Sequence, residues 1–566
     1  MKTETHYEKK PWLASYDDGV PEHIEYEKTF LTDMLTRTAE RYPDRAALVF
    51  EGKTITYRAL KTMVENFAAC LQSLGVGKGD SVAILLPNLV PAVVSYHATL
   101  TIGAIAVMNN PLYTDPELMH QFNDSGAKVL ITLDLLANRM INLRPATSIE
   151  KIIYTTIGDY LPFPQNILFK LFAKKKKMAT TVTPADNVYT WKECVSGPFG
   201  KCSPVSIDSD DVAMYQYTGG TTGVSKGVRL THDNLSRQVQ QFMAWAPSWL
   251  AGHETMLGAL PFFHMFGLST SMNLPIYGGW TSILMPRPKS DLLLKAIARY
   301  RPTLATMVPT MIIGMLNDPL IGRTDISCFR TIISGGSPLA VDVMRKFEAD
   351  TGAVIIEGYG LTEASPVTHV NPVGGKPRKV GSVGLPFPDT ECRVVDLEEG
   401  TVNVPFGEMG ELLIRGPQVM KGYLNMSDET KYALRDGWLY TGDIVTMDEE
   451  GYFYIVDRKK DLIISSGYNI YPRDIDEVFY SHPKVREACA IGIPDPKRGE
   501  NVKVLVVLKD GETATPDEFI DYCKTRLARY KHPTEIEFRA DLPKSNIGKI
   551  LRKQLKEEER LRVQGN

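Results

Sequence analysis

The sequence contains no run of apolar residues long enough to cross a bilayer. No stretch approaches the roughly 18 to 20 uninterrupted apolar residues that a spanning helix requires. The first 23 residues are polar and lack the apolar centre of a secretory signal. We therefore expect a soluble, cytoplasmic protein, and one basic segment discussed below leaves peripheral membrane association open.

Cysteine pairs and excess charge are also lacking. The seven cysteines are scattered, and no two of them form a Cys-x-x-Cys pair. This pattern supports neither a zinc site nor a disulfide framework, and it fits a reducing compartment. A net charge of -3 lacks the strongly basic balance that nucleic-acid binding needs, so we expect no nucleic-acid partner.

The alternation of apolar runs and helical stretches predicts an α/β fold. At 566 residues the chain is too long for one hydrophobic core. Short apolar runs, such as 82–86 and 127–133, end in turns and alternate with helical stretches such as 60–74 and 90–103. Such runs are typical of parallel sheets covered by helices.

The pattern changes after about Gly384. Runs at 391–396 and 410–415, separated by Gly and Pro, predict antiparallel strands and a small barrel. A new unit begins at or just after the charged cluster at 457–461, and the mixed helices and strands beyond it are numerous enough to fold independently.

A loop rich in glycine and threonine, residues 217–227, carries the strongest chemical signal. Its backbone N–H groups and hydroxyls are free to face a polyphosphate, and Lys226 adds positive charge. It is not a Walker loop, because Lys226 follows Ser225 and precedes Gly227. Taken alone, a loop of this composition could also be a flexible linker, although the phosphate-binding interpretation is favoured.

Further motifs follow along the chain. Ser334 precedes a glycine pair, where a flat ring could lie against bare backbone. Asp443, at an expected strand–turn junction, suits a ribose diol. His264 lies in an aromatic, apolar setting that a packed core histidine would fit equally well. The motifs occupy residues 261–267, 334–338, 357–363, 438–443, 457–461, 467–472 and 542–549.

Together, in this order, the motifs resemble the adenylate-forming superfamily of acyl-CoA synthetases, luciferases and peptide-synthetase adenylation domains. The resemblance spans about residues 29–556, and it is strongest to the bacterial long-chain fatty acid–CoA ligases. It implies ATP-dependent ligation of a long-chain fatty acid to coenzyme A through an acyl-AMP intermediate, with release of AMP and pyrophosphate and with Mg²⁺ as cofactor. A homodimer is left open.

The resemblance also implies a division of the α/β chain. A large N-terminal domain, residues 1–459, would contain two α/β subdomains and a small β-barrel. A small, mobile α+β domain, residues 460–566, would carry the catalytic lysine, with the hinge at Lys460. In this family the small domain rotates between the two half-reactions.

The site residues follow from the resemblance by motif position. It assigns catalysis to Lys549, Glu363 and Thr221, of which Glu363 and Thr221 would hold Mg²⁺. It assigns the acyl pocket to His264 and Gly360, and the coenzyme A tunnel to Gly467. The residues that it assigns to ATP or AMP are Thr218, Gly219, Gly220, Thr222, Gly223, Lys226, Gly335, Gly336, Gly358, Tyr359, Thr362, Asp443 and Arg458.

Other activities stay open. Acetate-type members of the superfamily carry tryptophan at the position of Gly360, and glycine would leave room for an acyl chain there. A medium-chain or aryl acid–CoA ligase would share the mechanism, as would an acyl-AMP ligase that serves a carrier protein. A non-catalytic nucleotide-binding module is disfavoured by the intact Lys549, Glu363 and Lys226.

Residues 161–178 set a bulky apolar stretch beside four consecutive lysines. Basic amphipathic composition of this kind suits an anionic membrane surface. The alternative is a solvated loop whose apolar residues pack on the body of the protein.

Overall fold

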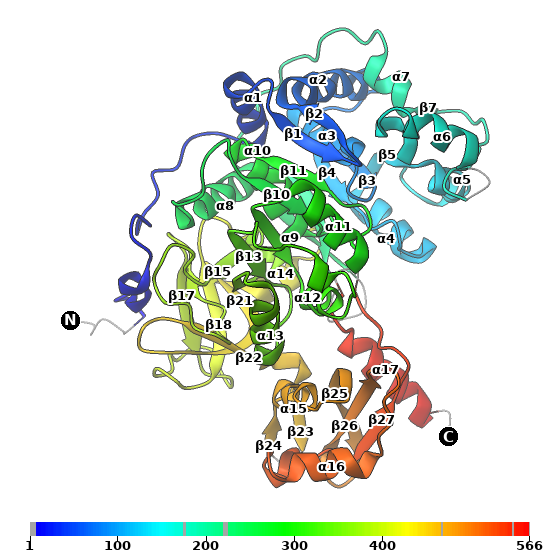
Figure 1. Cartoon of the computed structure of the whole chain (residues 1–566). Coiled ribbons are helices and arrows are strands. Elements are labelled where there is room, and N and C mark those ends of the chain that lie inside the picture. The colour runs from blue at the N-terminus through cyan, green and yellow to red at the C-terminus, as the bar shows by residue number, and fades with distance from the viewer. Residues whose placement is uncertain (1–6, 174–176, 219–224, 466–467, 546–547, 565–566) are drawn as a thin grey trace.

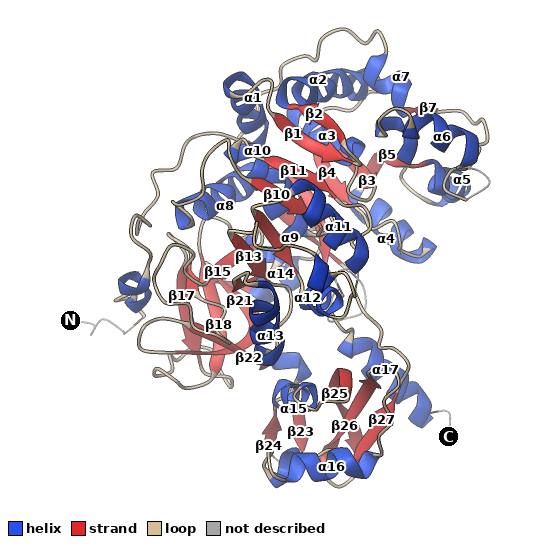
Figure 2. Ribbon diagram, viewed as in Figure 1, coloured by secondary structure: helices blue, strands red, loops and turns tan. Residues whose placement is uncertain are grey.

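A computed structural model of the chain describes residues 7–173, 177–218, 225–465, 468–545 and 548–564. Its described strands form four sheets. Two large sheets covered by helices build most of the N-terminal part, and a small unit at the C-terminal end lies beside them (Figures 1 and 2). The α/β class that the alternating pattern predicts is therefore confirmed.

The first large sheet has nine strands in the order β16-β15-β14-β13-β12-β10-β11-β1-β2. Its centre, from β14 to β1, is parallel, and antiparallel strands lie at both edges. The bounds are β1 Ala46–Phe50, β2 Lys53–Thr56, β10 Thr255–Gly258, β11 Thr281–Leu284, β12 Leu304–Met307, β13 Thr331–Ser334, β14 Ile355–Gly360, β15 Val367–Val370 and β16 Leu385–Pro386.

The second large sheet has eight strands in the order β19-β9-β8-β4-β3-β5-β6-β7. The strands from β8 to β7 are parallel, whereas β9 and β19 join antiparallel. The bounds are β3 Ser81–Leu85, β4 Ile105–Met108, β5 Ala127–Leu133, β6 Lys151–Thr155, β7 Val188–Thr190, β8 Val212–Thr218, β9 Lys226–Thr231 and β19 Gly422–Tyr423.

Burial explains why the central strands read as continuous apolar runs. All five residues of β3 and all four of β4 are buried, because helices cover both faces of the sheet. The helices of the N-terminal part are α1 Leu31–Arg41, α2 Tyr57–Ser73, α3 Val90–Thr101, α4 Asp115–Ser125, α5 Asp134–Leu143, α6 Gln165–Phe172, α7 Trp191–Ser196, α8 His232–Trp245, α9 Met265–Leu268, α10 Leu274–Gly278, α11 Ser290–Tyr300, α12 Pro309–Leu316, α13 Val341–Thr351 and α14 Ser427–Ala433.

The antiparallel strands expected after Gly384 are confirmed as a five-stranded sheet. Its order is β17-β18-β21-β20, with β22 also paired to β21. Among the described strands no pairing closes this sheet into a ring, so the barrel stays a prediction. The bounds are β17 Glu391–Val395, β18 Gly410–Arg415, β20 Leu434–Arg435, β21 Trp438–Met447 and β22 Phe453–Arg458.

The C-terminal unit has its own sheet, in the order β24-β23-β26-β25 with β27 paired to β26, and its own apolar core. This arrangement supports the predicted separate domain, whose exact boundary at residue 460 stays a prediction. The bounds are β23 Ile463–Ser465, β24 Tyr468–Ile470, β25 Val485–Asp495, β26 Gly499–Leu508, β27 Glu535–Phe538, α15 Pro472–Tyr480, α16 Pro516–Lys524 and α17 Arg552–Gln564.

None of the described helices combines the length and apolar character needed to cross a membrane.

Candidate active site

Three glycines lie at the carboxyl ends of the parallel strands β13 and β14, where open α/β sheets bind their ligands. A Cβ on Gly335 would lie 3.0 Å from the Phe266 ring, and one on Gly358 would lie 3.1 Å from the carbonyl oxygen of His369. Gly336 has a φ of 81°, which disfavours other residues. The strand does end in a glycine pair, as predicted. The assignment of these glycines to adenine stays a prediction.

Asp443 is the centre of a hydrogen-bonded group beside these glycines. The Tyr359 hydroxyl donates to its Oδ2 at 2.5 Å, and Arg458 Nε donates to its Oδ1 at 3.1 Å. Asp443 is buried and stands opposite Arg458 in the register of β21 and β22. Three residues assigned to the nucleotide from separate motifs thus touch one another.

The expected strand–turn junction at Asp443 is wrong. Asp443 lies inside the ten-residue strand β21, and Gly442, with a φ of 71°, precedes it. A left-handed glycine within a strand allows a local kink without ending the strand. That pattern resembles a turn in the sequence.

Lys226 and Glu363 belong to a second cluster of polar residues, in which Tyr423 contacts both of them. Lys226 is buried and forms an ion pair with Glu429 of α14. Its ammonium also lies 5.2 Å from the centre of the Tyr423 ring, and the Tyr423 hydroxyl donates to Glu363 Oε1 at 2.9 Å. The carboxylate and the lysine predicted to face the phosphates therefore share one neighbour.

Part of the phosphate loop lies outside the described residues, namely Gly219, Gly220, Thr221, Thr222 and Gly223. Gly467, assigned to the coenzyme A tunnel, lies outside them as well. The two residues that frame the loop are described. Thr218 and Lys226 pair directly across the β8–β9 hairpin, so the loop connects two adjacent antiparallel strands.

The described residues contain no group of three or more His, Cys, Asp or Glu side chains that could hold a metal ion. A Mg²⁺ ion bound mainly by substrate phosphates needs only one or two protein oxygens. Glu363 fits that requirement, because only its Oε1 accepts a described hydrogen bond.

Lys549 is the predicted catalytic residue that the C-terminal unit contributes, and the structure describes it. The charge of Arg458, followed by burial, lowers the pKa of Lys549 to about 7, while Asp443 and Asp461 oppose this shift. Among the described residues no carboxylate lies within ion-pair distance of its ammonium. No described carboxylate therefore neutralises the Lys549 ammonium directly.

A tight turn carries Lys549 to the N-terminal part. The Ser545 N–H donates to the Lys549 carbonyl at 2.6 Å, and the Lys549 N–H donates to Ser545 Oγ at 3.1 Å. Gly548, with a φ of 75°, touches helix α12, since a Cβ there would lie 2.1 Å from Thr310 Oγ1. This close approach requires glycine before the lysine.

His264 lies close enough to Lys549 for their charges to interact. Burial, followed by the charge of Lys549, lowers the pKa of His264 to about 4, so the imidazole is neutral at neutral pH. Its Nδ1 accepts from the Phe266 N–H at 3.2 Å, which leaves the ring proton on Nε2. A neutral ring suits the acyl pocket that the sequence assigns to it.

The space expected beside Gly360 is not there. A Cβ on Gly360 would lie 2.0 Å from the Pro366 carbonyl oxygen and 2.8 Å from Val367 Cα. The direction in which a side chain would extend is filled by backbone of the adjacent strand. Glycine is required here by strand packing, and its role in the acyl pocket stays a prediction.

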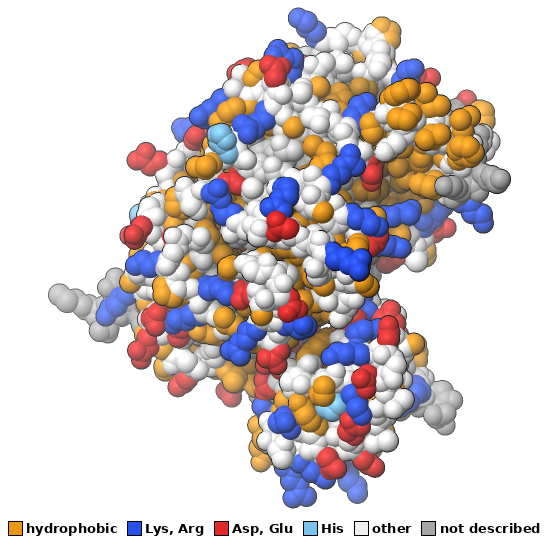
Figure 3. All heavy atoms as spheres, viewed as in Figure 1, with side chains coloured by type: hydrophobic (Ala, Val, Ile, Leu, Met, Phe, Trp, Pro, Cys, Tyr) orange, Lys and Arg blue, Asp and Glu red, His pale blue; other side chains and the backbone are white. Residues whose placement is uncertain are grey.

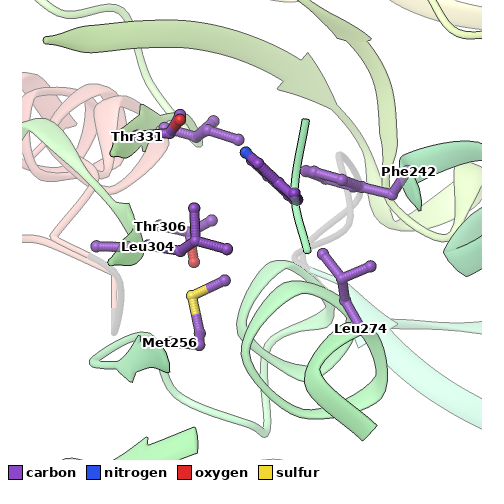
Figure 4. Close-up of a pocket in the computed structure, with 9 residues that line it drawn as sticks. Phe242, Met256, Leu274, Leu304, Thr306 and Thr331 are labelled. Atoms are coloured by element: carbon purple, nitrogen blue, oxygen red, sulfur yellow. The ribbon is translucent and has the colours of Figure 1, made fainter. Parts of the chain in front are cut away.

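An apolar void lies in the core between the strands β10, β12 and β13 and the helices α8 and α10 (Figure 4). It is too narrow to admit a water molecule. It therefore cannot hold an acyl chain unless its walls move. The nine lining residues are Phe242, Trp249, Met256, Leu274, Leu304, Ala305, Thr306, Thr331 and Ile333.

Two further predicted residues lie in short 3₁₀ turns. Thr362 begins the turn Thr362–Ala364, which is separated from the end of β14 by Leu361 alone. Lys460 lies in the turn Lys459–Asp461, between the last strand of the small sheet and β23 of the C-terminal unit. The position between two units agrees with the predicted hinge, which itself stays a prediction.

Tyr423, Glu429 and Thr310 were not identified from the sequence. Glu429 lies in the first turn of α14, where acidic residues are common for helical reasons alone. Thr310 meets Gly548 across 238 positions of the chain, a contact that no local pattern could reveal. Tyr423 follows Gly422, and this glycine is the one local signal in the sequence; in the structure it has a φ of 130°.

The comparisons with known proteins agree with this geometry. Residues 35–424 match the AMP-binding enzyme family, and residues 474–549 match the AMP-binding enzyme C-terminal domain. The long-chain-fatty-acid–CoA ligase of Bacillus subtilis (strain 168) is 44% identical, over 97% of this chain and 98% of that protein. The enzyme of the same name from Escherichia coli O157:H7 is 39% identical, over 98% of this chain and 99% of that protein.

Solved structures give the same result. ATP-bound MatB from Rhodopseudomonas palustris has a TM-score of 0.80 at 29% identity, covering 93% of this chain and 98% of that one. The anthranilate CoA ligase AuaEII, in complex with anthranoyl-AMP, has a TM-score of 0.84 at 25% identity, covering 95% of this chain and 98% of that one. The chain belongs to the AMP-binding enzyme family.

Proposed function

We propose that this protein is an AMP-forming long-chain fatty acid–CoA ligase. The substrate class is supported by the curated relatives, whose names specify long-chain fatty acids and which match almost the whole chain at 39% and 44% identity. The chemistry is supported by one observation above all. Lys549, from the C-terminal unit, lies beside Arg458 and Asp443 without an ion-pair partner among the described residues.

In the first step a carboxylate oxygen of the fatty acid attacks the α-phosphorus of ATP. The bond from that phosphorus to the bridging oxygen of pyrophosphate breaks, and acyl-AMP forms. Negative charge gathers on the equatorial oxygens and on the leaving group, and Lys549 would stabilise it. Among the described residues, no ion pair of Lys549 would have to break before it does so.

The remaining residues would bind and orient the nucleotide. Asp443 would accept from the ribose hydroxyls with Arg458 beside it, while Tyr359 and the three glycines would flank the adenine. Thr362 would contact the α-phosphate. The loop from Thr218 to Gly223 and Lys226 would hold the β- and γ-phosphates, and Glu363 and Thr221 would bind Mg²⁺, which would neutralise phosphate charge.

In the second step the coenzyme A thiol loses its proton, and its sulfur attacks the acyl carbon. The bond from that carbon to the AMP oxygen breaks, so that thioester and AMP leave. We propose that the C-terminal unit turns about Lys460 between the steps, so that the segment at Gly467 lines the thiol's path. Lys549 has no role in this second step.

A pyrophosphate-release assay across acids tests the substrate class. Acids from acetate to oleate, together with cinnamate-type acids, are incubated with enzyme, ATP, Mg²⁺ and coenzyme A. We expect acids of roughly 12 to 18 carbons to be favoured about tenfold or more over hexanoate, since each buried CH₂ adds to binding. A preference for acetate or an aryl acid would overturn the proposal.

Omitting coenzyme A from the same assay separates the ligase from an acyl-AMP ligase that serves a carrier protein. We expect thioester only when coenzyme A is present. Adenylate that accumulates in the presence of coenzyme A, with no thioester, would instead identify a carrier-protein enzyme.

A further inference from the structure

The first turn of helix α15 is capped by a carboxylate from outside the C-terminal unit. The backbone N–H groups in the first turn of a helix have no partner within the helix. Tyr471, which precedes α15, makes no side-chain capping bond. The N–H of Arg473 instead donates to Oδ2 of Asp457 at 2.8 Å, and Asp457 lies in strand β22 of the small sheet. A residue before the junction at Lys460 therefore completes a helix that lies after it.

The Arg473 side chain makes a second bond across the same boundary. Its guanidinium donates to the backbone carbonyl of Ile455, which also lies in β22. The side chain is only 18% exposed, so this bond is largely shielded from water. We call these two hydrogen bonds, from Arg473 to Asp457 and to Ile455, the β22–α15 contact. Figures 1 and 3 show the C-terminal unit lying against the rest of the molecule, with α15 at its edge nearest β22 in Figure 1.

Asp457 is buried, and its two oxygens depend on different units. Its Oδ1 accepts from the N–H of Arg458, the next residue of its own strand, at 2.7 Å, whereas its Oδ2 accepts from α15. Burial raises the pKa of Asp457, and the charge of Arg552, from the C-terminal unit, is the largest influence that opposes the rise. A buried carboxylate is costly unless hydrogen bonds and opposite charges compensate it. The docked C-terminal unit supplies both.

A second buried carboxyl of the N-terminal part lies within reach of the Arg473 charge. Glu357 lies in β14, next to Gly358, and its Oε2 has no hydrogen-bond partner among the described residues. Burial raises the pKa of Glu357 to about 7, and the Leu339 N–H and the charge of Arg473 oppose the rise. Arg473 therefore interacts with both the small sheet and the first large sheet.

We propose that Asp457 and Arg473 are positioning residues for adenylate formation, an inference that rests on the proposed two-step function. The β22–α15 contact holds the C-terminal unit in the arrangement that brings Lys549 beside Arg458. Asp457 and Arg473 lie on opposite sides of Lys460 in the chain, and a hydrogen bond does not survive about 1 Å of added separation. A turn of the C-terminal unit about Lys460 would therefore break the contact. Weakening the contact should slow the first step and spare the second.

The test measures each half-reaction of the full-length protein in single turnover. Arg473→Ala removes the guanidinium bond and should slow adenylate formation from ATP, Mg²⁺ and palmitate roughly tenfold, which is the contribution expected of a hydrogen bond from a charged group. Conversion of supplied palmitoyl-adenylate and coenzyme A to thioester should not slow. Asp457→Ala removes the acceptor on the other side of the boundary and should give the same division between the two steps.

Glu477→Gln is the matched control. Glu477 accepts from Nε of Arg473 at 2.9 Å, but it lies in the same helix and its side chain is 59% exposed. Its replacement therefore leaves the β22–α15 contact intact, and both half-reactions should keep their wild-type rates. A control that slows adenylate formation as much as Arg473→Ala would overturn the proposed role of the contact.

Amine labelling of Lys549 across pH, without substrates, reports the arrangement independently of turnover. The charge of Arg458 is the largest cause of the lowered pKa of Lys549, so Arg473→Ala should raise the labelling midpoint from about 7 toward the ordinary lysine value. An unchanged midpoint, or equal loss of both half-reactions, would overturn the inference. A wild type that makes no adenylate from any acid would instead overturn the proposed function, and the labelling comparison would still decide the role of Arg473.

Discussion

The two ends of the candidate site hold their lysines in opposite electrostatic states. Lys226, in the hairpin of the N-terminal part, is already neutralised by Glu429 and lies over the Tyr423 ring. Lys549, brought in from the C-terminal unit, lies beside the positive charge of Arg458, which lowers its pKa to about 7.

The difference indicates different tasks. A paired lysine is a preformed part of a binding surface, and an incoming phosphate must compete with its carboxylate. A lysine held beside another cation is under repulsion until an anion arrives, so it gains most from the charge that develops in the transition state. The preformed end would bind ATP, and the end closed by the C-terminal unit would act on it.

The largest expected effect tests Lys549, in the end of the site that the C-terminal unit closes. Lys549→Ala should slow adenylate formation by roughly two orders of magnitude or more, about 3 kcal/mol of transition-state stabilisation. The variant should still convert supplied acyl-adenylate and coenzyme A to thioester. Single-turnover assays of each half-reaction measure both. Lys544→Ala is the control, since Lys544 lies near the same turn but pairs with Glu487 and Asp541. Equal loss of both steps in Lys549→Ala would refute the division of tasks.

The second prediction concerns the junction that brings Lys549 in. Proline fixes φ near -65°, within the range used by the 3₁₀ turn that contains Lys460. Lys460→Pro should hold the present arrangement, so that pyrophosphate exchange persists while thioester formation falls by roughly tenfold or more. Lys460→Ala removes the same charge without restricting the backbone and serves as the control. If both variants lose thioester formation equally, the backbone at this position is not the hinge.

The third prediction concerns the cation beside Lys549. Below its pKa of about 7 Lys549 is charged, and above it the amine is neutral and reactive, so labelling by an amine-specific reagent should rise through pH 7. Arg458→Gln removes the largest cause of the shift. The midpoint should then move toward the ordinary lysine value of about 10.4, and labelling at neutral pH should fall roughly fivefold.

Quantitative mass spectrometry of the labelled peptide across pH measures this midpoint. Bound ATP should also raise it, since phosphate charge favours the ammonium. The lowered pKa also fixes how docking of the C-terminal unit depends on pH. Without nucleotide, the contact made by Lys549 becomes more favourable as the pH rises above 7, because the ammonium that Arg458 repels loses its charge. A midpoint that Arg458→Gln leaves unchanged would contradict repulsion as the cause.

The smallest expected effect tests the ion pair between Lys226 and Glu429, in the end of the site that the N-terminal part forms alone. Glu429→Gln should release Lys226 from its ion pair and lower the KM for ATP by about threefold. The expected effect is small because the Glu429 side chain is partly open to solvent, which weakens the ion pair. The rate of adenylate formation at saturating ATP should change little. Asp428→Asn is the matched control, since Asp428 is the adjacent acid and is 96% exposed. A raised KM in Glu429→Gln would show that this carboxylate orients Lys226 for the phosphates.

Local pattern was sufficient for the elements and for most candidate residues. The strand at 127–133 matches β5, and the helix expected at 90–103 is α3, because apolar periodicity and turn residues act within a few positions. Pattern failed at Asp443, where a kinking glycine inside β21 resembled a turn, and at Gly360, where missing side-chain volume was read as free space.

The sequence by itself determined the α/β class, the separate C-terminal unit and the motifs at Lys226, Glu363, Asp443 and Lys549, since composition and spacing are properties of the chain. Only the tertiary structure decided which charges meet. Packing brings together residues that are far apart in the sequence, as in the pairing of Lys226 with Glu429 and the contact of Gly548 with Thr310. Packing also decides which face of α6 is exposed. Electrostatic energy depends on distance and burial in space.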